Sequence, residues 1–284
     1  MRGKLGVWAF IGLVLWPGFA AAAIIGPTDD WKPLRVGARD LGVSEDTIKR
    51  IVAAGVGISC PGTEHGNGGA LNGWFLGADA AGLYTNAHGV IDIGTDKKAN
   101  LIEPLDDCRV RSYRDLMSSG AKATAYPLNL PNNRDELALG TFNPQTDVPY
   151  KDRAHLMLMR AVLGAKALPL PDLTKLPLTV GEEIILVSLR PPAMREPEIQ
   201  ACHIRAITQR RGMPGLVLTD CDNDFGNSAG LYMVRDPSSA GALVPVALHE
   251  SCHQKLGDHK DWNAEDNTAI GILFGTPFFQ FASR

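Results

Sequence analysis

The sequence lacks the features that mark membrane-spanning, nucleic-acid-binding and zinc-ribbon proteins. It contains five cysteines, and no two of them form the C-x-x-C pair of a zinc ribbon. The formal net charge is only −3, so neither nucleic acid nor an anionic membrane surface is indicated as a partner. No internal repeat and no low-complexity linker is present. Beyond the first 23 residues, no stretch is long and apolar enough to span a bilayer.

Residues 1–23 have the pattern of a secretory signal peptide. A short basic head precedes an apolar run over residues 5–19, and the four alanines at 20–23 provide an A-x-A type cleavage site. A membrane anchor is the alternative, but the run is shorter than the ~20 residues of a spanning helix, and Pro17 interrupts it. We therefore expect a secreted or periplasmic protein of roughly 260 residues without a stable membrane anchor.

The remaining composition is that of a β-rich globular protein. Hydrophobic residues make up 45% of the chain and charged residues 21%, with 30 glycines and 19 prolines between short apolar runs. That pattern favours strands and turns over long helices. We expect residues 24–55 to form a lead-in or propeptide, with a short helix capped by Ser44, before a main domain at 56–284. Strands are predicted near residues 56–60, 74–76, 83–85, 154–158, 180–188, 244–249 and 269–273.

One glycine-flanked serine stands out as a candidate nucleophile. Ser228 lies in Gly226-Asn227-Ser228-Ala229-Gly230, where glycines allow a sharp turn and close approach of a substrate. A serine hydroxyl reacts poorly unless a base takes its proton and backbone N–H groups hold the oxyanion. The G-x-S-x-G pattern alone is weak, so a reactive Ser228 requires a histidine and a carboxylate elsewhere in the chain.

His88 is the candidate base. It follows the predicted strand at 83–85, in T-N-A-H-G-V, where small neighbours would leave the imidazole ring accessible. An unperturbed histidine has a pKa near ~6.5, which suits it to accept and return a proton near neutrality. Because the chain contains seven histidines, a packed or surface role is the alternative for His88 on its own.

The two segments together resemble a known enzyme family. The run G-W-F-L-…-L-Y-T-N-A-H-G-V resembles the histidine segment of trypsin-like serine proteases, and G-N-S-A-G resembles their serine segment, in the same order. The D-C-D-N-x-x-G-N-S-A-G stretch is similar to bacterial members near the glutamyl-endopeptidase branch. The resemblance implies an all-β fold of two packed six-stranded β-barrels with the active site in the cleft between them. It also implies a serine endopeptidase that acts on polypeptides without a metal or organic cofactor.

Two aspartates are candidates for the acid that orients His88. Asp152 precedes a strand in which Ala154, Leu156 and Leu158 share one face, and this segment resembles the family's D-x-A-x-L-x-L sequence. Asp135, in R-D-E-L-A-L, is the alternative. We favour Asp152, which would hold the histidine in the correct tautomer and stabilise its charged form.

The resemblance also implies the remaining site residues. The backbone N–H groups of Gly226 and Ser228 would form the oxyanion hole. Asn223 and His249 would approach the specificity pocket, which favours a polar or acidic residue before the cleaved bond. A structural role for His249 at a strand end is the alternative.

The family resemblance also implies a pairing for most of the cysteines. Cys202 with Cys221 would bracket a hairpin leading to the serine loop, and Cys60 with Cys108 is the second expected pair. Cys252 is left over.

Two departures from the family pattern affect expectations. Ala229 replaces the usual glycine after the serine, and its methyl group could crowd the substrate strand. Asn227 replaces the aspartate that pairs with a freshly exposed N-terminus in trypsins, although Ile24-Ile25-Gly26 looks like such an N-terminus. We therefore do not expect trypsin-style activation.

Two other functions compete with the protease hypothesis. An esterase of the α/β-hydrolase class would also fit G-N-S-A-G, but too few residues follow Ser228 and a strand rather than a helix is predicted there. A protease-fold domain that binds peptides without turnover is the other, since fold does not guarantee activity.

Overall fold

Most of the chain after the first 23 residues is described by the computed structural model. The described residues are 24–60, 70–78, 80, 82–93, 99–101, 108–119, 122–128, 152–190, 196–209, 214–224, 226–239, 241–254, 261–265 and 267–275. The predicted signal peptide and the alternative acid Asp135 lie outside these residues.

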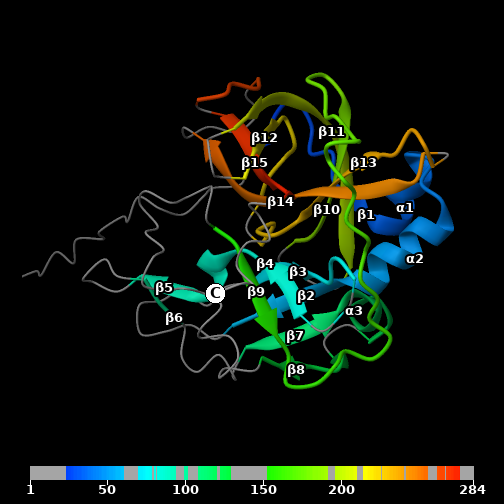
Figure 1. The fold of residues 1–284 in the computed structure, drawn as a ribbon, viewed down its shortest axis with the longest axis vertical. Helices are drawn as coiled ribbons and strands as arrows, with labels where there is room; N and C mark the ends of the chain where they lie inside the picture. The colour runs from blue at the N-terminus through cyan, green and yellow to red at the C-terminus, as the bar shows by residue number, and fades with distance from the viewer. Residues whose placement is uncertain are drawn as a thin grey trace, which may run out of the picture.

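The second half of the chain forms a closed barrel (Figure 1). Its strands are β10 (Glu183–Leu189), β11 (Pro197–Thr208), β12 (Leu216–Thr219), β13 (Leu231–Arg235), β14 (Leu243–Gln254) and β15 (Asn267–Leu273). The antiparallel order is β11-β10-β13-β14-β15-β12, and pairing of β11 with β12 closes the circle. The short strand β1 (Lys32–Pro33) adds to the outer edge of β11. Closure leaves this barrel without an unpaired sheet edge at β12.

The first half forms a curled six-stranded sheet. Its strands are β2 (Gly55–Ser59), β3 (Ala70–Trp74), β4 (Gly82–Thr85), β7 (Arg109–Ser112), β8 (Tyr126–Pro127) and β9 (Ala154–Met157), in the order β8-β7-β2-β3-β4-β9. Its edges meet at a bridge between Leu128 and Leu158, beside a 3.2 Å hydrogen bond from Met159 N to Pro127 O. The edges touch so briefly because β8 and β9 are short.

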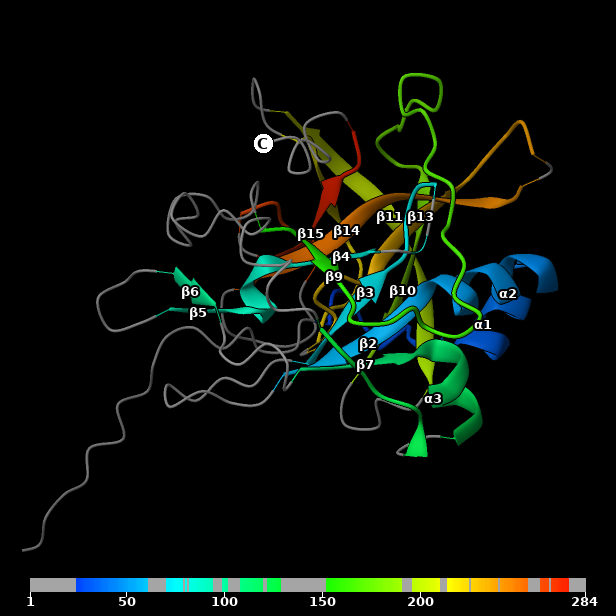
Figure 2. The same cartoon turned by 60° about the horizontal axis from the view of Figure 1, so that its bottom comes forward.

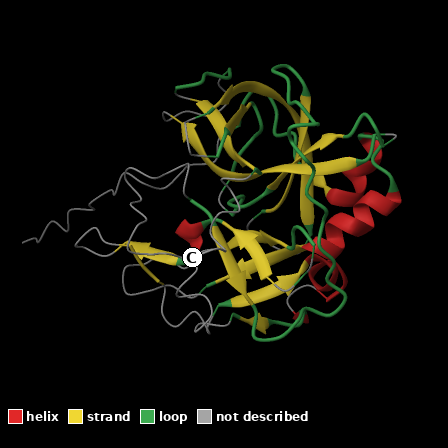
Figure 3. Cartoon of the chain, viewed as in Figure 1, coloured by secondary structure: helices red, strands yellow, loops and turns green. Residues whose placement is uncertain are grey.

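Helices cover one side of the molecule. The helices are α1 (Leu34–Asp40), α2 (Glu45–Ala54) and α3 (Tyr113–Ser119), with a single 3-10 turn η1 (Ala87–Gly89). Figure 3 shows α1, α2 and α3 together, and Figures 1 and 2 place the hairpin of β5 (Ile91–Ile93) and β6 (Ala99–Leu101) on the opposite side. The Ser44 hydroxyl accepts from Thr47 N at 3.2 Å, so the predicted capped helix is present.

The lead-in segment is part of the hydrophobic core. Leu34, Ile48 and Ile51 are buried in the same apolar cluster as Trp74 from the first sheet and Ile185 from the second barrel. Full burial of one such aliphatic side chain contributes about 1.5–3 kcal/mol. The helices at 34–54 therefore join the two sheets together.

The predicted all-β, two-barrel architecture is confirmed, with one difference in detail. The strand order closes the second barrel fully, whereas the first is a sheet curled until its edges touch. Among the described residues, no helix has the length and apolar character needed to cross a membrane.

Candidate active site

His88 lies between Asp152 and Ser228. Its Nδ1 is 2.5 Å from Asp152 Oδ2, and its Nε2 is 2.8 Å from Ser228 Oγ. His88 comes from η1 after β4, Asp152 precedes β9, and Ser228 lies in the loop between β12 and β13. The three side chains therefore meet at the boundary between the first sheet and the second barrel.

Asp152 is positioned to fix the imidazole tautomer. It is fully buried, and its Oδ1 accepts a 2.8 Å hydrogen bond from the backbone N of His88 while Oδ2 faces the ring. Asn86 Nδ2 donates to the Asp152 carbonyl at 2.9 Å and holds the backbone. Because a carboxylate accepts, Nδ1 donates to it, which leaves the Nε2 lone pair for the serine hydroxyl.

The environment stabilises the charged form of His88. Burial of the ring lowers its pKa, but the charge of Asp152 and the hydrogen bond to it outweigh this effect and raise the pKa to about 9. The side chain is 41% exposed, so one edge of the ring faces solvent and a bound substrate could reach it. Only the neutral imidazole can accept a proton from Ser228, and the raised pKa makes that neutral form a stronger base.

A second buried carboxyl group lies beside this pair. Ligand atoms of His88, Asp152 and Glu250 lie within 4.8 Å of one another. Such a group could bind a cation, but both Asp152 oxygens already face donors of His88. We interpret the cluster as one held by shared protons.

The serine loop leaves two backbone donors in place for an oxyanion. Gly226 has φ +84°, a conformation that glycine adopts without strain. Asn227 N donates to Asp224 O at 3.1 Å, and Gly230 N donates to Asn227 O at 2.7 Å. Among the described residues, no backbone acceptor faces the amides of Gly226 and Ser228. These two are the amides expected to form the oxyanion hole.

Asn72 connects this loop to the first sheet. It is fully buried on β3, and its Nδ2 is 2.9 Å from Gly226 O and 3.0 Å from Ser228 O. Its backbone N also donates to Ser228 O at 2.9 Å. On the other side of the amide, Oδ1 accepts from Tyr113 Oη at 2.5 Å and Leu189 N at 2.8 Å. The loop shape therefore depends on a side chain far away in sequence.

Ala229 does not crowd the open side of the site. It has φ +57°, a left-handed conformation that costs a non-glycine residue about 1–2 kcal/mol. Its side chain is fully buried in the apolar cluster between the sheets. Its carbonyl accepts from Trp74 Nε1 at 2.7 Å, and its N donates to His249 O at 2.8 Å. Ala229 therefore has a strained backbone but a well-packed side chain, and its methyl group does not obstruct the substrate as expected.

His249 and Asn223, which are both predicted to approach a specificity pocket, are in contact with each other. Since Asn223 Oδ1 only accepts, His249 Nε2 donates to it at 2.7 Å, and Nδ1 then accepts from Tyr232 Oη at 3.0 Å. Burial and the nearby charge of His88 lower the pKa of His249 to about 3. The imidazole of His249 is therefore neutral, with both nitrogens occupied by protein groups.

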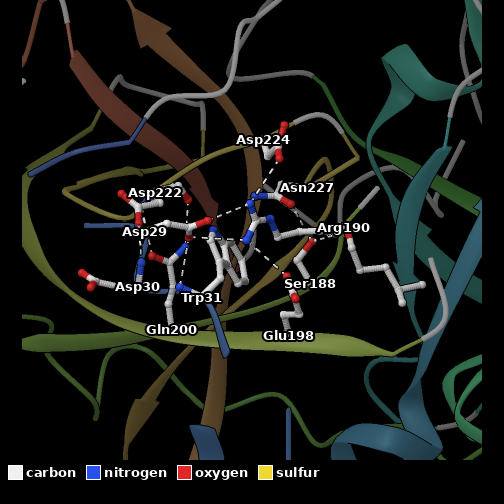
Figure 4. Close-up of polar contacts among 11 residues, drawn as sticks. Asp29, Asp30, Trp31, Ser188, Arg190, Glu198, Gln200, Asp222, Asp224 and Asn227 are labelled. Carbon is white, nitrogen blue, oxygen red and sulfur yellow. Dashed lines mark hydrogen bonds and ion pairs between the residues drawn. The ribbon is translucent and has the colours of Figure 1, made fainter. Parts of the chain in front are cut away.

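The N-terminal segment is bound beneath the serine loop (Figure 4). Asp222 is buried, and its two oxygens accept from Ile25 N at 2.7 Å and Asp30 N at 2.9 Å. Burial raises the pKa of Asp222 to about 6, although the two backbone hydrogen bonds lower it. Asn227 is not the partner of this segment, but a carboxylate five residues earlier is.

An arginine extends the same network. The Arg190 guanidinium lies 3.3 Å from Asp29, 3.2 Å from Glu198 and 3.2 Å from Asp224, and its cation sits 5.2 Å from the centre of the Trp31 ring. Figure 4 shows these groups converging from the N-terminal segment, β11 and the serine loop. The arginine thereby links three separate segments by charge-assisted hydrogen bonds.

The cysteines pair as the resemblance implied. Cys202 joins Cys221 and Cys60 joins Cys108. The first bond connects β11 to the serine loop, and the second connects the end of β2 to the start of β7. Cys252 lies in β14 opposite Ala269.

Sequence reasoning did not identify Asn72, Asp222 or Glu250 as site residues. Asn72 carries no local signal, because its partners lie on other strands. An acidic residue directly after His249, in the apolar run of a predicted strand, was a usable signal for Glu250. Asp222 adjoins Asn223, and the structure shows that it binds the chain's own N-terminal segment.

Of the comparisons with known proteins, the one with solved structures identifies the fold. No family model matches the chain, and no curated protein matches it either. Among solved structures, it is similar to a Glu endopeptidase in complex with MPD, with a TM-score of 0.57 and 13% sequence identity, over 91% of this chain and 97% of that one. The sheets, their order and this similarity lead to one conclusion: the chain has the two-barrel fold of the chymotrypsin-type serine proteases.

Proposed function

We propose that the protein is a serine endopeptidase. The observation that carries the proposal is the position of His88, with Nδ1 2.5 Å from Asp152 and Nε2 2.8 Å from Ser228. This is the arrangement in which a histidine takes the proton of a serine while a carboxylate stabilises the resulting imidazolium. A domain that only binds peptides has no need of all three groups in contact.

The reaction would proceed through an acyl-enzyme. Ser228 Oγ attacks the scissile carbonyl carbon as His88 Nε2 takes its proton, and the carbonyl oxygen becomes an oxyanion. The amides of Gly226 and Ser228 hold that oxyanion, and loss of one such donor typically costs about 10²–10³ in kcat. His88 then protonates the leaving amine. Water attacks the acyl-enzyme by the same route and regenerates the serine.

The substrate would be a polypeptide with a polar or acidic residue before the cleaved bond. Support comes from the contact of His249 with Asn223 and from the similarity in fold to a Glu endopeptidase. Because His249 is neutral and both its nitrogens are bound to protein groups, a substrate carboxylate would be recognised by hydrogen bonds from Asn223 and not by the imidazole. A peptide-library cleavage profile tests this preference, and cleavage mainly after lysine, arginine or large apolar residues would contradict it.

We also propose that the protein acts after export. The signal-peptide pattern at residues 1–23 and the two disulfides support an oxidising compartment. Neither metal nor organic cofactor has a step in the proposed chemistry, so chelators should not affect activity.

Labelling with a fluorophosphonate tests the central proposal directly. The reagent should modify Ser228 in the mature protein, as mapped by mass spectrometry, and both Ser228→Ala and His88→Ala should abolish labelling. Ser118→Ala, which removes an exposed hydroxyl on α3, is the matched control and should label normally. Peptide hydrolysis by a folded Ser228→Ala variant, or a folded wild-type protein that does not label, would refute the proposal.

A further inference from the structure

Glu250 is a buried acid next to the proposed catalytic residues. It follows His249 on β14, and only 3% of the residue is exposed. One of its carboxyl oxygens lies within 4.8 Å of ligand atoms of Asp152 and His88, and the Ser251 hydroxyl donates to Glu250 Oε2.

Two buried carboxyl groups in contact cannot both carry a charge at neutral pH without a large penalty. Asp152 has two donors from His88, so its charge is compensated. Glu250 has no such compensation, since no lysine or arginine forms an ion pair with it in the described part of the chain. A hydrogen bond between two carboxyl groups also requires a proton on one of them. The proton between the two carboxyl groups is therefore assigned to Glu250.

We propose that Glu250 is a positioning residue of the triad, a neutral carboxylic acid whose O–H donates to the carboxylate of Asp152. The inference rests on the proposed protease function of His88, Asp152 and Ser228. In this arrangement Asp152 receives a third donor besides the two from His88, and its orientation is fixed from both sides. The Asp152–Glu250 pair then carries one negative charge instead of two.

The surroundings of Glu250 agree with this assignment. Burial and the charge of Asp152 raise the pKa of Glu250 to about 8, while Ser251 and the charge of His88 lower it. The other titratable neighbour, His249, is neutral. The charge of an ionised Glu250 is one cause that raises the pKa of His88. A protonated Glu250 consequently leaves His88 easier to deprotonate.

This assignment gives the enzyme an alkaline limit with a definite sign. As pH rises through the pKa of Glu250, Asp152 loses a donor and gains a like-charged neighbour. The pKa of His88 then rises, so less of the imidazole is in the neutral form that acts as a base until the pH exceeds that raised pKa. Activity should therefore fall where Glu250 ionises.

Infrared spectroscopy tests the protonation state independently of catalysis. The wild-type minus Glu250→Gln difference spectrum should show the carbonyl stretch of a protonated carboxylic acid at neutral pH, and this band should vanish at alkaline pH. Glu265→Gln, which alters an exposed carboxylate, is the matched control and should give no such band at neutral pH. Absence of the band from the Glu250→Gln difference would overturn the proposal, whether or not fluorophosphonate labels Ser228.

Kinetics separate positioning from simple structural support. Glu250→Gln keeps the shape and a donor to Asp152 but does not ionise, so the fall in kcat at alkaline pH should disappear in this variant. Glu250→Ala removes the donor and should lower kcat by about tenfold or more with little change in KM. An unchanged alkaline limb in Glu250→Gln would contradict the proposal. If wild-type protein shows the infrared band but does not label, the protease function fails and the Glu250 assignment stands.

Discussion

Asn72 is the residue on which the geometry of the serine loop depends most directly. Its amide NH2 faces Ser188 Oγ at 2.9 Å as well as the carbonyls of Gly226 and Ser228. These three groups are acceptors towards Asn72, so the side chain must present hydrogens to them. An aspartate of nearly the same shape presents only acceptors.

We therefore expect Asn72→Asp to disable the site while largely preserving the fold. Repulsion between the new carboxylate and the two carbonyls should displace the loop and reduce acylation by about 10²–10³, the cost of losing an oxyanion donor. Stability should drop by about 1–3 kcal/mol for unpaired buried groups. The measurements are the rate of fluorophosphonate labelling and urea unfolding. Ser188→Ala, which removes only one contact, should have a much smaller effect, and wild-type labelling of Asn72→Asp would contradict the expectation.

The sequence was enough to single out His88, Asp152 and Ser228 as candidates, and the structure places them in contact, but the residues that support them could not be predicted. His88 and Ser228 stand in segments whose local order is informative by itself. Asn72 and Glu250 acquire their roles from partners on other strands, as in the contact between β3 and the serine loop. Single-sequence reasoning has no access to such pairings unless a buried polar residue is noticed within an apolar run.

At the scale of elements, the N-terminal segment illustrates the same limit. The helix after Ser44 was predicted from its cap and apolar spacing, and it is present as α2. The hydrogen bonds from Ile25 and Asp30 to Asp222 were not predicted. They join residues that are far apart in the chain, with a sequence separation of 197 for the Ile25–Asp222 bond. Local signals define the element, and tertiary contacts define where it binds.

Asp222 should make the docking of this segment sensitive to pH. Its pKa in the folded protein, about 6, lies above the value of about 4 of an unfolded aspartate, so the folded state binds the proton more tightly. The contribution of this group to stability is therefore complete below about pH 4 and is lost as pH rises through about 6. Asp222→Asn mimics the protonated form and should lack this change.

Urea unfolding of both proteins across this pH range measures the difference. The free energy of unfolding of the wild type minus that of Asp222→Asn should fall as pH rises. A constant or rising difference would show that burial does not dominate at Asp222. Asp261→Asn, which alters an exposed aspartate shortly before β15, provides a matched control.

At the scale of the whole molecule, the two disulfides should contribute unequally. Their sequence separations are 48 for Cys60–Cys108 and 19 for Cys202–Cys221. By chain entropy these loops correspond to about 4 and about 3 kcal/mol. Replacing each pair by alanines and measuring thermal unfolding should show a loss of stability in both variants, larger for Cys60–Cys108. Equal stability of either variant and the wild type would contradict this expectation.

The meeting of β8 with β9 has a consequence for how the proposed activity would be lost on heating. Among the described residues, the first sheet is held shut by little more than the bridge between Leu128 and Leu158, and Asp152 lies two residues before β9. Fraying of that seam would release the aspartate from His88 while the closed barrel remained intact. Activity would then be lost through local, reversible fraying of β9. This loss would occur at a lower temperature than the cooperative unfolding of the rest of the protein.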